Sequence, residues 1–81
     1  MKTLHQIRAT HFMPGDVVYW SGAWGRQPEH IARITEIVDE QTGEIMQNVK
    51  CSELTGSGRR YTVSLDNGHW AYGFQISKYT N

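Results

Sequence analysis

Hydrophobic and polar residues alternate in short runs along the chain, and glycine-containing turns separate the runs. A strand points successive side chains to opposite faces, so an alternating run that is bounded by turns predicts a β-strand. The pattern predicts five strands, over residues 16–21, 29–40, 45–51, 60–66 and 69–72. Five short strands at this spacing indicate an all-β protein, and a partly open barrel is the most economical architecture.

The last two predicted strands carry the clearest local signal. Asn67-Gly68 separates them, and this dipeptide readily accepts the positive φ angles of a tight hairpin turn. The alternation before the turn predicts that Tyr61, Val63 and Leu65 point inward, with Arg60, Thr62 and Ser64 outward. Residues 73–76 then read as a short turn or a 3₁₀ segment.

Residues 29–40 fit two structures. Ile31, Ile34 and Val38 recur at helical spacing, and Pro28 suits a first helical position. However, the segment is rich in β-branched residues, which are crowded in a helix and comfortable in a sheet. We favour a strand, in which Ile37 reaches the core only if the strand bends or bulges.

The first strand has large apolar groups on both faces. Val17 and Tyr19 point one way, whereas Val18 and Trp20 point the other. A loop with two glycines and a proline follows. Before the strand, residues 1–11 form a polar segment that is either one helical turn, capped by Thr3, or a tail. The barrel domain is therefore expected to span residues 12–79.

Composition excludes several classes of protein. The 81 residues are enough for one domain, and eight basic residues balance eight acidic ones to a net charge of zero. The chain thus lacks the overall positive field of many nucleic-acid-binding proteins. Cys51 is the only cysteine, and no signal peptide or membrane span is evident, so we expect a cytoplasmic protein with no membrane partner.

Aromatic residues are the most informative candidates for a function. They form two clusters, around Trp20 and Trp24 and around Trp70 and Tyr72, and three tryptophans exceed what a small core needs. Exposed rings would suit stacked bases, a proline-rich peptide or a cationic group. The alternative is that Trp20 and Trp70 fill the core, with their indole N–H groups bonded to nearby carbonyls. Trp24, in its glycine loop, is the better candidate for exposure.

Arginines supply a second indication. Arg26, Arg59 and Arg60, with Arg33, would add positive charge if the two loops that carry most of them face the same way. Because the net charge is zero, we favour a protein partner, with RNA or DNA as the alternative. The other explanation for the arginines is a solvated turn that protects a sheet edge.

Catalytic and metal-binding patterns are weak. The acidic run of Glu36, Asp39, Glu40 and Glu44 lacks the spacing of a calcium loop and reads as a solvated hairpin. The four histidines have no cysteine partner at zinc spacing, and Cys51 reads as an inert buried thiol. We therefore expect no cofactor, no metal and no catalytic residue.

Three segments carry a resemblance to a known superfamily. Pro-Gly-Asp-Val-Val at 14–18, Ile-Ala-Arg-Ile-Thr-Glu-Ile at 31–37 and Tyr-Thr-Val-Ser-Leu-Asp-Asn-Gly at 61–68 resemble the SH3-like barrels of the KOW and Tudor kind. The resemblance spans about residues 12–76 and implies a five-stranded barrel that binds peptides, RNA, DNA or ribosomal surfaces. Short chains of this kind also resemble accessory proteins of phages and mobile elements.

An enzyme family of similar size is also similar in part. The Phe-Met-Pro-Gly-Asp-Val opening, Ser-Gly-Ala-Trp at 21–24 and the pair Gln75-Ile76 resemble the plasmid-borne type II dihydrofolate reductases, which work as tetramers. That family's catalytic stretch is Val-Gln-Ile-Tyr, whereas residues 74–77 read Phe-Gln-Ile-Ser. The missing valine and tyrosine make the resemblance architectural. An oligomeric enzyme is a second alternative, and a purely structural homo-oligomer is a third.

Overall fold

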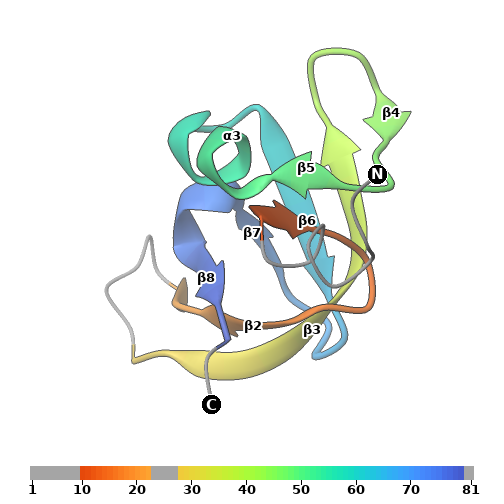
Figure 1. Ribbon diagram of the computed structural model, residues 1–81. Coiled ribbons are helices and arrows are strands. Elements are labelled where there is room, and N and C mark those ends of the chain that lie inside the picture. The colour runs from red at the N-terminus through yellow and green to blue at the C-terminus, as the bar shows by residue number, and fades with distance from the viewer. Residues whose placement is uncertain (1–9, 23–27, 80–81) are drawn as a thin grey trace.

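A computed structural model describes residues 10–22 and 28–79 (Figure 1). The described chain is built mostly from short strands. They are β1 (His11–Phe12), β2 (Val17–Trp20), β3 (His30–Asp39), β4 (Glu44–Ile45), β5 (Val49–Lys50), β6 (Tyr61–Leu65), β7 (Trp70–Tyr72) and β8 (Ile76–Lys78). A short helix α3 (Cys51–Gly56) follows β5, and a 3₁₀ helix η1 (Gly73–Gln75) joins β7 to β8.

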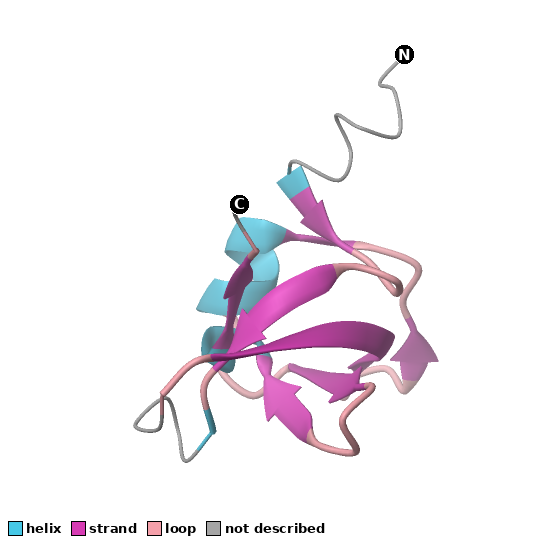
Figure 2. Ribbon diagram, turned by 90° about the horizontal axis from the view of Figure 1, so that it is seen from below, coloured by secondary structure: helices cyan, strands magenta, loops and turns pink. Residues whose placement is uncertain are grey.

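All the strand pairs are antiparallel, which confirms an all-β architecture for the described part of the chain. The main sheet has the order β7-β6-β3-β2-β8, and β4 pairs with β3 beside this path. β1 and β5 form a separate two-stranded sheet. Over residues 10–22 and 28–79 the main sheet does not close, because β7 and β8 lie at its two ends. Figure 2 shows the curved sheet with α3 at one side of it.

β3 confirms the strand interpretation of residues 29–40. Its pairing with β6 shifts between Ile34 and Glu36, which is the predicted irregularity. A bulge changes which face the following side chains occupy. Ile34 and Ile37 are consequently both buried although they lie three residues apart.

The β6–β7 hairpin also follows the prediction. Gly68 has a φ of 84° in the turn, and the Leu65 N–H donates to the His69 carbonyl at 2.9 Å. The inward side chains of β6 are all buried, as expected from the alternation. They join Phe12, Val18, Ile37 and Leu54 in one core between the sheet and α3.

The prediction of one strand over residues 45–51 is wrong. Only two short pieces are strands, and β5 pairs with β1 rather than with β3. In one continuous strand Ile45 and Val49 would share a face. Instead Ile45 is 68% exposed, whereas Val49 is buried. Cys51 begins α3 instead of continuing an apolar alternation.

Three elements were not foreseen, namely α3, β8 and β1, the last of which pairs with β5. The helix α3 buries Leu54 and packs against η1 so closely that a Cβ placed on Gly73 would lie 1.9 Å from the Leu54 carbonyl oxygen. β8 supplies the strand that pairs with the outer edge of β2.

No helix of the described chain is long and apolar enough to cross a membrane. Of the segment 1–11, predicted as a helical turn or a tail, residues 1–9 lie outside the described residues, whereas His11 belongs to β1. Of the loop predicted after the first strand, residues 23–27 lie outside the described residues as well.

Candidate binding surface

Three aromatic side chains form a continuous row at the β7 end of the main sheet. The Trp70 ring meets the Tyr72 ring edge to face, with centroids 5.1 Å apart. Tyr72 in turn stacks on Phe74, with centroids 5.9 Å apart. Trp70 is 57% exposed and Phe74 is 42% exposed, while Tyr72 is half-buried between them. We call Trp70, Tyr72 and Phe74 the aromatic row.

Local structure explains why these rings lie together. In β7 the small side chain of Ala71 points inward and is fully buried, so Trp70 and Tyr72 both face outward. The backbone N–H of Tyr72 donates to Gln75 Oε1 at 2.9 Å, and Gln75 Nε2 donates to the Ser21 carbonyl at 3.1 Å. These bonds hold η1 in place and set Phe74 beside Tyr72.

The two adjacent arginines have different surroundings. The Arg59 guanidinium lies 5.9 Å from the centre of the Tyr72 ring, within cation–π range, and so adds positive charge to the aromatic row. Arg60 Nη2 instead lies 2.9 Å from Asp39 Oδ2. The hydrogen bond from Arg60 lowers the pKa of the buried Asp39 carboxyl, and the same bond raises the pKa of Arg60. Arg60 is thus engaged in holding β6 to the end of β3.

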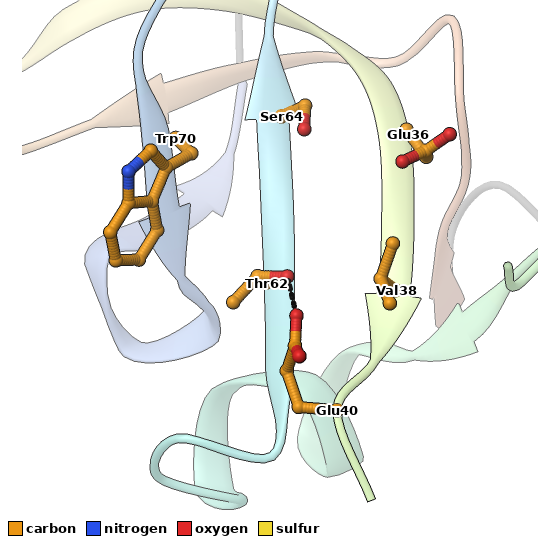
Figure 3. A pocket seen from close by; sticks show the side chains of 6 residues that line it. All are labelled: Glu36, Val38, Glu40, Thr62, Ser64 and Trp70. Atoms are coloured by element: carbon orange, nitrogen blue, oxygen red, sulfur yellow. Dashed lines mark hydrogen bonds between the residues drawn. The ribbon is translucent and has the colours of Figure 1, made fainter. Parts of the chain in front are cut away.

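A hollow of about 470 Å³ lies against Trp70 on the outer face of β3, β6 and β7 (Figure 3). Its lining comes from alternate residues of these strands and from the turn after β3. The lining residues are Glu36, Val38, Glu40, Thr62, Ser64 and Trp70. The Thr62 hydroxyl donates to Glu40 Oε1 at 2.7 Å across the strands.

Trp20, the other tryptophan that the structure describes, belongs to the core. It is 8% exposed, and its ring stacks on His69 with centroids 4.8 Å apart. The His30 ring also lies beside Trp20, tilted by 38°, with centroids 5.9 Å apart. The buried Trp20 Nε1 has no hydrogen-bond partner among residues 10–22 and 28–79, so the predicted carbonyl partner is not found there.

The structure brings together three of the seven predicted binding residues, namely Arg59, Trp70 and Tyr72. Trp20 is in the core and Arg60 is in an ion pair, while Trp24 and Arg26 lie outside the described residues. Arg33, expected near the other arginines, donates to the Gly15 carbonyl at 2.9 Å. Phe74, Glu36 and Glu40 were not assigned to the binding surface.

Metal-ligating side chains do not cluster in the described residues. No three His, Cys, Asp or Glu side chains of that part of the chain group as metal ligands. Cys51 is half-buried, and burial raises the pKa of its thiol, which disfavours the reactive thiolate. The amide of Gln75, which carries part of the resemblance to the reductases, is occupied by its two hydrogen bonds to the backbone.

Comparisons with known proteins do not add to this description of the surface. No protein-family model, curated protein or solved structure matches the chain. The surface combines a row of rings with an arginine beside Tyr72 and an acidic hollow beside Trp70. Such a surface can bury apolar groups, stack on flat groups and attract a cation.

Proposed function

We propose that this protein is a non-enzymatic interaction module that binds a protein partner through the aromatic row. One observation carries the proposal: the rings of Trp70, Tyr72 and Phe74 touch one another while Trp70 and Phe74 stay exposed. Contiguous exposed aromatic surface is unusual in a monomeric protein, and aromatic residues are enriched at the centres of protein interfaces.

Charge favours a protein partner over a nucleic acid. The chain has no net charge, and Arg60 already neutralises Asp39. Glu36 and Glu40 line the hollow beside Trp70, where they would repel a phosphate backbone. A protein surface can satisfy the same carboxylates with hydrogen-bond donors or cations.

A nucleic acid is the second candidate, favoured by the Arg59 guanidinium over the Tyr72 ring. Proteins that bind single strands combine stacking rings with nearby positive charge. Ionic strength separates the two candidates. Phosphate contacts release counterions, so binding to a nucleic acid weakens steeply as salt rises, whereas binding to an apolar protein surface responds little.

We also propose that the fold is an SH3-like barrel. The strand order β8-β2-β3-β6-β7, with a 3₁₀ helix between the last two strands of the chain, supports this assignment. In such a barrel the loop after the first strand lies near the later hairpins. Trp24 and Arg26, which follow β2 in the sequence and lie outside the described residues, therefore stay part of the proposed surface.

Affinity capture from cells of the native host tests the proposed function. The unmodified chain is expected to retain a partner protein. The Trp70→Ala and Trp24→Ala variants should still fold but should no longer retain that partner. Ile31→Ala is the matched control, because Ile31 is 58% exposed on β3 and lies outside the aromatic row. Equal capture by Trp70→Ala and Ile31→Ala would contradict the proposal, and so would capture of nucleic acid alone.

A further inference from the structure

The hollow beside Trp70 has two chemically different walls. Figure 3 shows Trp70 on β7 to one side of Ser64 and Thr62, and Glu36 on β3 to the other. Glu40 closes the hollow beyond Thr62, whose hydroxyl donates to it. The floor is therefore hydroxyl-lined and one wall is an aromatic ring, whereas the opposite wall carries Glu36 and Val38, with the Glu40 carboxylate at one end.

The carboxylates of this hollow are not neutralised by its own lining. None of the six lining residues is a lysine or an arginine. Glu36 makes no side-chain hydrogen bond or ion pair with any residue of the described ranges. Glu40 uses one oxygen to accept from Thr62, which leaves the second oxygen able to accept from a ligand.

Strand geometry sets the width of the hollow. Ser64 pairs with Glu36 on one side and with Trp70 on the other, so β6 runs midway between the two walls. Neighbouring strands are about 4.8 Å apart, so a group lying over Ser64 is within about 5 Å of both walls. A cation interacts with a tryptophan face within about 6 Å, so one group can contact the ring and a carboxylate together.

We infer that this hollow binds a cationic side chain, an arginine or a lysine, of the partner protein. This inference rests on the proposed function and names the chemistry that the partner brings beside the aromatic row. A purely apolar occupant would strip water from Glu36 and Glu40 without replacing it, which is costly. A phosphate or an acidic side chain would meet two like charges. A guanidinium or ammonium group instead supplies donors to both carboxylates and packs on Trp70.

The experiment is a titration of the isotope-labelled full chain, followed by two-dimensional ¹⁵N–¹H NMR. The probe is the peptide acetyl-Gly-Arg-Gly-amide, and its control replaces arginine with citrulline, which has the same shape without the charge. Trp70→Phe assigns the indole resonance of Trp70. We expect the arginine peptide to shift this resonance and the amides of Thr62 and Ser64 in a saturable way, with the citrulline peptide causing no saturable shift.

Matched charge variants complete the test. Glu36→Gln is expected to weaken binding of the arginine peptide about three- to fivefold, because one surface ion pair is lost. Glu44→Gln, which removes the same charge from an exposed residue outside the hollow, should leave the affinity unchanged. Equal binding of the two peptides, shifts located elsewhere, or equal effects of the two variants would each overturn the inference.

The outcomes also separate this inference from the proposed function. If the arginine peptide does not bind but partner capture still depends on Trp70, the cationic pocket is wrong and the interaction module stands. If the peptide binds as expected but Trp70→Ala does not change capture of the partner protein, the cationic pocket stands and the proposed role of the aromatic row is wrong.

Discussion

The Trp70 and Tyr72 rings meet edge to face, with centroids 5.1 Å apart, on the outer side of β7. Edge-to-face packing is a favourable geometry for two aromatic rings, and Trp70 remains 57% exposed beside Tyr72. The same strand buries Ala71 between them, so the fold places its small residue inside and its two large rings outside. This arrangement is the reverse of what filling a core would require.

The two described tryptophans should therefore differ in their effect on stability. Trp20→Ala removes a buried ring and should cost about 3–5 kcal/mol, enough to unfold much of a domain of this size. Trp70→Ala loses mainly the contact with Tyr72 and should cost about 0.5–1.5 kcal/mol. Urea unfolding followed by circular dichroism measures both. Similar losses would show that Trp70 contributes to the core.

Gly73 should tolerate no side chain. A Cβ at this position would lie 1.9 Å from the Leu54 carbonyl oxygen, so Gly73→Ala must separate η1 from α3. We expect a loss of about 1–3 kcal/mol, as for other overpacked sites. Gly56→Ala is the control, since a Cβ there meets nothing within 4 Å. Thermal unfolding should show a lower Tm for Gly73→Ala alone, and an unchanged Tm would refute the close contact.

Two isoleucines of β3 provide a matched test of the bulge. Ile37 is fully buried and Ile31 is 58% exposed. Ile37→Val should cost about 0.5–1.5 kcal/mol, whereas Ile31→Val should stay within about 0.5 kcal/mol of the unmodified chain. For a domain of this length 1 kcal/mol corresponds to about 4–8 °C in Tm. The register shift after Ile34 explains why Ile37 is buried. Equal effects of the two substitutions on stability would contradict this explanation.

The ion pair of Asp39 with Arg60 predicts how stability depends on pH. The pair lowers the folded-state pKa of Asp39, so its stabilisation is complete above the ordinary carboxyl pKa of about 4 and is lost as pH falls through the folded-state value. Arg60→Ala should therefore be less stable than the unmodified chain at pH 7, and the difference should shrink below about pH 4.

Denaturant unfolding at pH 7, 4 and 2.5 measures this difference. Lys50→Gln, which removes one positive charge from an exposed side chain, is the control and should follow the unmodified chain at all three values. A deficit of Arg60→Ala that persists undiminished at the lowest pH would show that Arg60 stabilises the protein by packing rather than through Asp39.

Local patterns were enough to predict part of the fold. The Asn67-Gly68 turn and the alternation over residues 60–66 predict the β6–β7 hairpin, and Ile37 required the bulge in β3. By contrast, α3 has six residues and one buried side chain, Leu54, so it has no periodicity to detect. Packing against η1, from a distant part of the chain, stabilises it. β8 is likewise three residues long and depends on its distant partner β2.

The binding surface could have been predicted further than it was. Thr62 and Ser64 were expected to face outward, and in a hairpin their partners must do the same. Those partners are Tyr72 and Trp70, so the exposure of Trp70 follows from the hairpin itself. The contribution of Glu36 could not be predicted, because the bulge in β3 decides which face its side chain takes.

Site-specific crosslinking tests the central claim most directly. A photoreactive phenylalanine replaces Phe74 in one version of the chain and the exposed Glu53 of α3 in another, and both are irradiated in cells of the native host. We predict a discrete protein adduct at position 74 that resists nuclease and is lost when Trp70→Ala is added. No such adduct at position 53 is expected. Equal adducts at both positions, or an adduct at 74 that Trp70→Ala leaves intact, would contradict a partner-binding role for the aromatic row.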